Sequence, residues 1–246
     1  MDPQHLQELH NEEARYWWPV NKRRIVVSFL NRFVRPDAQV LEVGCGGGFF
    51  SAQLSKRYPL HVAADISPQS VQFACQQGCR LGTVFNGNEG LPFASESFDA
   101  VLILDVLEHL EQDKLTTAEI LRVLKSGGVM IATVPAHPSL FSAWDKILEH
   151  KRRYSRSQFK ALCEGAGLRM ARLSFWNLVS LPPALLIRGM DRLSKKKRNN
   201  ADFPQIPGWL NTAFQVWGIL ENAALRICNI PAGLSLVAVC VKDKRN

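Results

Sequence analysis

Several glycines and one carboxylate lie close together in the sequence, between a short apolar run and a segment that is expected to form a helix. The run is Gln39–Val43, and the sequence across its end reads Glu42-x-Gly44-x-Gly46-x-Gly48. Glycines between a strand and a helix let a ligand come close to the backbone, because no side chain is in the way. A dinucleotide fingerprint would need glycine where the chain has Phe49, and a phosphate loop would need a lysine that does not follow. The spacing therefore predicts close approach of a ligand without a pyrophosphate site.

A second carboxylate, Asp65, ends the next apolar run, 21 residues after Gly44. At the end of a strand, a carboxylate can accept hydrogen bonds from both ribose hydroxyls of a nucleoside. Each feature has an ordinary alternative, a tight turn for the glycines and a helix cap for Asp65. Together they predict an adenosine-type cofactor.

The elements that would position these residues alternate between apolar runs and helices. Apolar runs without polar alternation lie at His61–Ala64, Phe98–Leu104, Val129–Val134 and Leu234–Val241. Helices are expected at Phe49–Arg57, Ser67–Gln77 and Lys114–Leu124. The alternation predicts an α/β fold in which helices cover both faces of a parallel sheet.

Five stretches resemble the class I S-adenosylmethionine-dependent methyltransferases, and more narrowly their bacterial type 11 group. They read VLEVGCGGG, DIS, LPFASESFDAV, LEHL and EILRVLKSGGVMIATVP, and they span about residues 40–135. The resemblance implies a Rossmann-like sheet of seven strands, mostly parallel, with one reversed strand near the C-terminus. Leu234–Val241 would suit an edge strand. The implied cofactor is S-adenosyl-L-methionine.

The same resemblance implies which residues contact the cofactor. Expected beside its methionine part are Glu42, Gly44, Cys45, Gly46, Leu104 and Asp105, with Asp65 at the ribose and Ile66 against the adenine. The family often places an acidic residue near the adenine amino group, where this chain has Gly87. Asn88 or Glu89 would make that contact instead.

Methyl transfer from a sulfonium is an in-line displacement that mainly needs alignment and exclusion of water. A general base is required only when the nucleophile carries a proton of high pKa. His109 and His137 follow predicted strands and are the catalytic candidates, while a structural turn is the alternative for His109. No metal is expected, because no Cys and His residues share a zinc-binding spacing.

Acceptor-binding residues are expected in two further segments. Trp17 and Trp18 could close over the site, or they could simply pack an amphipathic helix. His150, Arg152 and Arg153 could meet a phosphate or carboxylate, or they could form a solvated basic turn.

Charge divides the chain unevenly. Residues 1–150 hold 13 Lys and Arg against 17 Asp and Glu, whereas residues 151–246 hold 17 against 5. A basic C-terminal third points to a polyanionic partner. Leu173–Met190 followed by the basic run Lys195–Arg198 has the two-part character of a contact with an anionic membrane surface, and a buried helix pair is the alternative. Nucleic acid is disfavoured, because no helix-turn-helix or zinc-finger motif is present.

One methyltransferase domain over residues 1–246 accounts for these features. It divides into an N-terminal helical lid (1–36), a cofactor-binding core (37–150) and a helical insertion for substrate or membrane contact (173–230). Glu13–Phe33 is expected as a helix that Pro19 interrupts. The N-terminus has no signal-peptide core, which predicts a cytoplasmic protein, on the inner face of the membrane if the insertion binds lipid. Three functions stay open: methylation of an amphipathic or lipid-linked acceptor, methylation of a soluble small molecule, and cofactor binding as a non-catalytic partner subunit.

Overall fold

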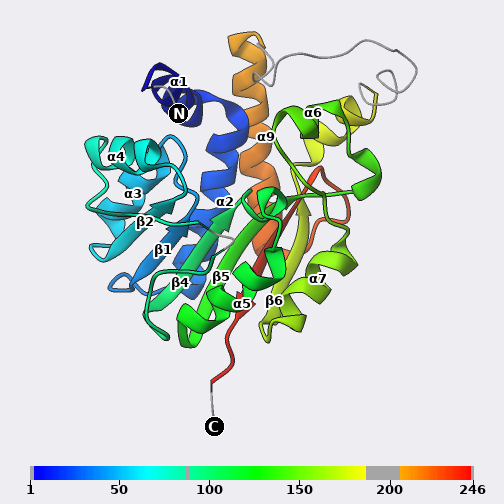
Figure 1. Ribbon diagram of the computed structural model, residues 1–246. Helices are drawn as coiled ribbons and strands as arrows, with labels where there is room; N and C mark the ends of the chain where they lie inside the picture. The colour runs from blue at the N-terminus through cyan, green and yellow to red at the C-terminus, as the bar shows by residue number, and fades with distance from the viewer. Residues whose placement is uncertain (1–2, 87–88, 187–205, 245–246) are drawn as a thin grey trace.

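A single seven-stranded sheet organises the computed structural model, which describes residues 3–86, 89–186 and 206–244 (Figure 1). The strands are β1 (Val40–Val43), β2 (His61–Asp65), β3 (Leu81–Val84), β4 (Phe98–Leu104), β5 (Leu124–Pro135), β6 (Arg169–Trp176) and β7 (Ser235–Val241). Their order is β3-β2-β1-β4-β5-β7-β6, and only β7 runs antiparallel to its neighbours. The predicted mostly parallel sheet with one reversed strand is confirmed.

The prediction that Leu234–Val241 forms an edge strand is wrong. Strand β7 lies between β5 and β6 and pairs with both. The edge is β6, which the sequence hides because Arg169, Arg172 and Ser174 interrupt its apolar residues. Strand β3 at the opposite edge is also invisible as an apolar run, since most of its side chains are exposed.

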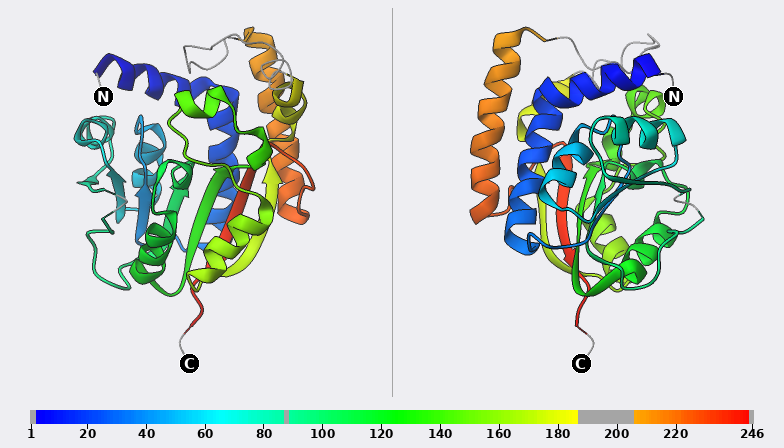
Figure 2. Two further views of the ribbon diagram at one scale, coloured as in Figure 1. Left: turned by 45° about the vertical axis from the view of Figure 1, so that its right-hand side comes forward. Right: turned by 90° about the vertical axis from the view of Figure 1, so that its left-hand side faces the viewer.

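Helices cover both faces of the sheet, as predicted (Figures 1 and 2). One face packs against α5 (Asp113–Val123) and α7 (Arg156–Gly165). The other packs against α2 (Trp17–Phe33), α3 (Phe49–Arg57), α4 (Pro68–Gln76) and α9 (Gly208–Ile227). Because β1, β2, β4 and β5 are parallel, their carboxyl ends meet at one edge of the sheet, where open α/β sheets bind ligands.

The N-terminal segment forms two helices, but the break is not at Pro19. Helix α1 (Pro3–Arg15) ends before Tyr16, which takes an extended conformation, and α2 begins at Trp17. Pro19 lies in the first turn of α2, where its missing N–H costs no intrahelical hydrogen bond. Figure 2 shows α1 lying across the end of the molecule, above α3 and α4.

The predicted helical insertion at 173–230 begins too early. Leu173–Trp176 complete β6 and pair with β7, because their alternate side chains pack against the sheet's helices. The basic run Lys195–Arg198 lies outside the described residues. In the described part of the chain, no helix combines the length and apolarity that crossing a membrane requires.

Helix α9 packs along α2 through polar contacts. The buried Asn21 amide donates to the Phe214 carbonyl oxygen at 2.9 Å, and the Asn222 amide donates to the Asn21 carbonyl oxygen at 3.1 Å. Gly218 is what allows this approach, because a Cβ there would overlap the Asn21 side chain.

Replacing Gly218 by alanine should therefore destabilise the protein, although alanine is the better helix former. We expect Gly218→Ala to lower the free energy of unfolding by about 1–3 kcal/mol through overpacking. Urea titration followed by circular dichroism measures this. The matched control is Gly208→Ala in the same helix, where no atom lies within 4 Å of the added Cβ. Equal stability of the two variants would contradict the packing assigned to Gly218.

Candidate functional site

The turn between β1 and α3 holds its shape because its glycines have backbone conformations and neighbours that exclude side chains. The Gly44 N–H donates to the Ala64 carbonyl oxygen at 2.7 Å, which ties the turn to β2. Gly44 has a φ of +84°, and a Cβ there would overlap the Val106 side chain in the turn after β4. Gly46, with a φ of +51°, donates its N–H to the Asp65 carboxylate at 3.1 Å. The turn thus brings backbone and Asp65 together, as the sequence suggested.

Asp65 and Ile66 lie at the carboxyl end of β2 beside this turn. The Asp65 carboxylate accepts hydrogen bonds from the backbone of Gly46 and from the Ser67 N–H, which is 2.9 Å away. The carboxylate is only partly buried, so it keeps acceptor capacity for a ligand. Ile66 is 65% exposed, which is unusual for a large apolar side chain beside such a turn. A ribose whose hydroxyls donate to Asp65, with the flat face of its base against Ile66, fits these two surfaces.

Glu42 does not face this opening. Its carboxylate is buried, accepts from the Ser51 hydroxyl at 2.5 Å and lies 3.3 Å from His61 Nε2. Burial lowers the pKa of His61, but the neighbouring Cys79 and Glu42 side chains outweigh it and raise the pKa to about 9. Glu42 and His61 thus lie against each other in the interior behind the turn. A contact of Glu42 with the methionine part of a cofactor stays a prediction.

Glu13, on α1, reaches the same turn, and the sequence offered no signal for it. Its two carboxylate oxygens accept from the Gly47 N–H at 3.0 Å and the Phe49 N–H at 3.1 Å. These amides open α3, where an anion is stabilised by unpaired N–H groups. Burial nevertheless raises the pKa of Glu13 to about 7. Only the folding of α1 over the sheet edge brings Glu13 there.

The end of β4 faces α2. Asp105 has a φ of +56°, its N–H donates to the Thr133 carbonyl oxygen at 2.9 Å, and its carboxylate lies 2.8 Å from Lys22 Nζ. Lys22 also lies over the Trp18 ring, 4.6 Å from its centroid. Leu104 is half-buried beside Asp105. Lys22 thus lies between Trp18 and Asp105, which places Trp18 near the end of the site where the methionine part of the cofactor is predicted to bind.

Trp17 points elsewhere. It is 8% exposed, packs edge-on against Phe214 of α9 at 5.1 Å between ring centroids, and its backbone N–H donates to the Asn211 side chain. These contacts match the packing alternative for Trp17. A role for it in closing over the site stays a prediction.

Of the two catalytic candidates, His109 is the one that contacts another predicted site residue, His150. His109 lies in the short helix η1 (Leu107–His109) after β4, and its ring packs edge-on against His150 at 4.7 Å between centroids. Burial lowers the pKa of His109, and the nearby His150 adds to this effect. The ring of His137 is instead stacked on Phe175, and its Nε2 lies 2.9 Å from the Gly233 carbonyl oxygen.

Both arginines of the predicted basic turn are paired with protein carboxylates. Arg152 lies 2.9 Å from Asp113, and the buried Arg153 lies 2.5 Å from Asp145. Arg153 is therefore not part of a solvated turn, whereas the Arg152 side chain is 32% exposed. A role in binding an acceptor anion stays a prediction for both.

The remaining predicted residues lie near the turn or outside the described chain. Cys45 is buried, and burial raises the pKa of its thiol. Glu89 is exposed and accepts from the Asn86 amide at 2.7 Å. Asn88 lies outside the described residues.

The environment of Glu13 predicts a pH dependence. A carboxyl whose pKa is about 7 in the folded protein and 4.5 in the unfolded chain destabilises the fold as pH rises between these values. We expect the free energy of unfolding to fall by about 2–3 kcal/mol from pH 4.5 to pH 7 on this account, and Glu13→Gln to remove that fall. Urea titrations at pH 5 and pH 8 compare the two proteins, with Glu8→Gln on the same helix as the control. A Glu13→Gln variant with the wild-type pH dependence would contradict the assignment.

Comparison with known proteins agrees with this geometry. The family model of a methyltransferase domain matches residues 41–132. An uncharacterised protein of Methanocaldococcus jannaschii is 31% identical over 147 residues, which are 59% of this chain and 67% of that protein. A ubiquinone biosynthesis O-methyltransferase of Parvibaculum lavamentivorans is 28% identical over 159 residues, which are 54% of this chain and 63% of that protein's length.

The solved structures agree in fold. A S-adenosylmethionine-dependent methyltransferase from Thermotoga maritima superposes with a TM-score of 0.60 at 17% identity, covering 97% of this chain and 99% of that one. The sheet order, the glycine turn after β1, Asp65 after β2 and these similarities have one common explanation. The chain belongs to the class I S-adenosylmethionine-dependent methyltransferase family, whose cofactor is S-adenosyl-L-methionine.

Proposed function

We propose that this chain transfers a methyl group from S-adenosyl-L-methionine to an amphipathic, lipid-linked acceptor at a membrane surface. The bound cofactor supplies an electrophilic methyl group on a positively charged sulfur. Asp65 binds and orients the ribose, Ile66 packs on the adenine, and the backbone of Gly44 and Gly46 lines the methionine part. Trp18 and Lys22 of α2 would exclude water from the end of β4. An acceptor atom held there would form a bond to the methyl carbon on the side opposite the sulfur, while the carbon–sulfur bond breaks and the neutral thioether leaves.

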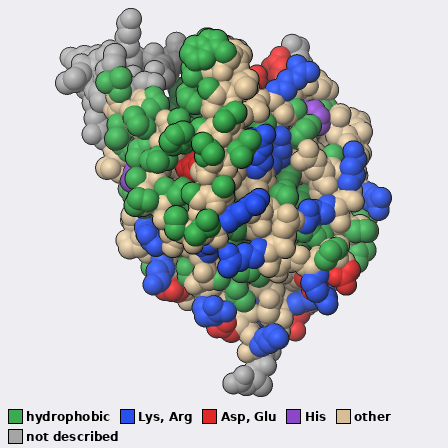
Figure 3. Space-filling view, turned by 180° about the vertical axis from the view of Figure 1, so that it is seen from behind, with side chains coloured by type: hydrophobic (Ala, Val, Ile, Leu, Met, Phe, Trp, Pro, Cys, Tyr) green, Lys and Arg blue, Asp and Glu red, His purple; other side chains and the backbone are tan. Residues whose placement is uncertain are grey.

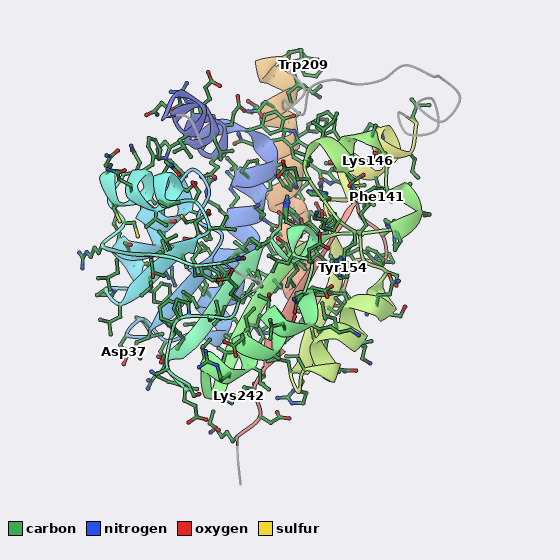
Figure 4. The ribbon with its side chains drawn as sticks, in the orientation of Figure 1. Asp37, Phe141, Lys146, Tyr154, Trp209 and Lys242 are labelled. Atoms are coloured by element: carbon green, nitrogen blue, oxygen red, sulfur yellow. The ribbon has the colours of Figure 1, made fainter. Side chains whose placement is uncertain are left out.

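The single observation that supports a lipid-linked acceptor is the outer face of α9. Exposed apolar side chains recur there at helical spacing and form a stripe of Trp209, Ala213, Val216, Leu220, Ala223 and Ile227. The exposed fractions of the large ones are high: 73% for Trp209, 62% for Leu220 and 88% for Ile227. Figure 3 shows hydrophobic side chains gathered on this face, and Figure 4 places Trp209 at the outer end of α9.

The inner face of the same helix carries buried polar side chains beside the apolar Phe214 and Leu225. Asn211, Glu221 and Asn222 all turn toward the protein, where they bond to the backbone of Trp17, Leu178 and Asn21 respectively. An ordinary surface helix turns its main apolar stripe toward the core, whereas the stripe from Trp209 to Ile227 faces outward. A large exposed apolar stripe marks a surface that meets lipid or a partner.

Basic groups beside the stripe favour lipid over an apolar protein partner. A shallow hollow between α2 and α9 is lined by Arg32 and Arg226 together with Ser28, Phe29 and Asn31. An apolar helix face flanked by arginines suits acyl chains next to anionic headgroups. Helix α2 connects this hollow to Lys22 and Trp18, so it links the membrane-facing surface to the site.

Two alternatives use the same cofactor site. In the first, the acceptor is a soluble small molecule and α9 is a cap; in the second, the chain binds the cofactor as a non-catalytic partner subunit. The name of the Parvibaculum lavamentivorans relative refers to ubiquinone, a lipid, which favours the lipid-linked acceptor.

The cofactor site is tested by Asp65→Ala. We expect affinity for S-adenosyl-L-methionine to fall by about 10- to 100-fold, because hydrogen bonds to a charged group are worth about 1.5–3 kcal/mol. Isothermal titration measures this. The control is Asp99→Asn, because Asp99 is the second residue of β4, at the opposite end of the strand, where its carboxylate pairs with Lys125 and accepts from the Gln39 N–H. With methyl-labelled cofactor and a membrane-containing lysate, labelled product should enter the organic phase for the wild type, while unreacted cofactor stays in the aqueous phase. Labelled product found only in the aqueous phase, after its separation from unreacted cofactor, would favour the soluble acceptor, and no labelled product would favour the partner subunit.

Membrane contact is tested by Leu220→Glu in the stripe. We expect its partitioning onto vesicles of anionic phospholipid to fall at least about tenfold, because a buried leucine side chain contributes about 1.5–3 kcal/mol. Flotation of the purified protein with such vesicles measures this. The control is Leu60→Glu, which changes a leucine that is 48% exposed on a different surface. Flotation that the two substitutions reduce equally would argue against α9 as the contact.

A further inference from the structure

Three side chains that can bind metal converge after β4. Glu108 and His109 come from η1, and His150 comes from the segment after the short helix α6 (Ala143–Ile147). One ligand atom from each lies within 4.8 Å of the other two. Two imidazoles and one carboxylate form the ligand set of many catalytic zinc sites.

Among the described residues, no hydrogen bond offsets the cost of burying the Glu108 carboxylate. Its side chain is fully buried, and neither oxygen has a hydrogen-bond partner among the described residues. Two cations that act on Glu108 are paired with other carboxylates, Lys22 with Asp105 at 2.8 Å and Arg153 with Asp145 at 2.5 Å. Burying a carboxylate without a partner is costly, so such groups are paired or bind a metal. Something that the polypeptide does not supply is therefore expected beside Glu108.

Both imidazoles are held from behind. His150 Nδ1 lies 3.2 Å from the buried Asp145 carboxylate, which leaves Nε2 for a ligand. Asp145 is itself anchored by Arg153 and by the Ser142 N–H at 2.9 Å. The His109 ring hydrogen-bonds to the backbone of Glu149. Metal-binding histidines have this arrangement, in which a carboxylate or carbonyl fixes one ring nitrogen and orients the other.

We propose that Glu108, His109 and His150 bind one divalent transition-metal ion, with zinc as the ion that this ligand set fits. Three protein ligands leave a coordination position open for an oxygen donor. Glu108 and His109 follow Asp105 closely at the end of β4, so the ion would lie beside the end of the sheet where the acceptor is proposed to bind. The acceptor class would then be a hydroxyl or another oxygen ligand, an assignment that rests on the proposed function, whereas the metal site itself does not.

The sequence did not predict this site, and its expectation of no metal is revised by the proposal. Zinc motifs are recognised when ligands recur within a few residues, but His109 and His150 are 41 positions apart. Folding of the segment after α6 against η1 brings them together.

Metal binding to the full chain tests the proposal without cofactor or acceptor. Protein stripped with a chelator is titrated with Co²⁺, read by its visible absorption, and with Zn²⁺, read by competition. We expect one ion per wild-type chain and affinity lower by at least about 100-fold for Glu108→Gln and for His150→Asn, because loss of an outer partner alone costs about 10- to 100-fold. The matched control is Glu111→Gln, whose exposed carboxylate on the same loop pairs with Lys151, and it should bind like the wild type.

A thermal melt separates loss of the site from loss of the fold. Zinc at about 100 times its Kd should raise the Tm of the wild type by about 5–10 °C and leave that of Glu108→Gln unchanged. No bound ion in the wild type would overturn the proposal, as would equal binding by Glu108→Gln. A Glu108→Gln variant that is more stable than the wild type with and without zinc would also overturn it, and would show that Glu108 is buried as a neutral acid. Because the titration contains no cofactor, its result is independent of whether the chain methylates anything.

Discussion

The turn from β1 to α3 has no room for side chains, and the rest of the site depends on that constraint. A Cβ at Gly44 would overlap Val106 in the turn after β4, and a Cβ at Gly48 would come within 2.6 Å of the Ala74 backbone in α4. The turn is therefore in close contact with the segment after β4 and with α4. Its N–H groups are presented to carboxylates on both sides, Asp65 from β2 and Glu13 from α1.

The buried carboxylates near the carboxyl ends of the strands differ in which side chains pair with them. Glu42 is paired with His61, and Asp145 is paired with Arg153 and His150. Removing one partner from such a pair leaves an uncompensated charge, so these pairs hold the turn and the segment after α6 in place. Glu108 lies among them without a partner in the described chain, which is why it carries the inference of a metal ion.

Helix α9 gives the molecule a second functional surface. Its buried polar side chains satisfy backbone groups of α2 and of the segment after β6, while the apolar stripe from Trp209 to Ile227 remains outside. Since α2 bears both this interface and the Lys22–Asp105 ion pair, one helix connects the outer surface with the end of β4. A shift of α9 on contact with a membrane or a partner would therefore be transmitted to the site by one helix, α2.

The local sequence by itself determined the cofactor half of the protein. Apolar runs, Gly44, Gly46 and Asp65 lie within 30 residues of one another, and a strand–turn–helix unit is formed by short-range preferences that a sequence displays. Tertiary structure alone decided the other half. It placed β7 inside the sheet instead of at its edge, turned Trp17 into the α2–α9 interface, brought Glu13 onto the glycine turn and joined His109 to His150. These contacts join residues far apart in the chain, and their partners are selected by packing and by the burial of charge, neither of which leaves a periodic or spaced pattern in the sequence.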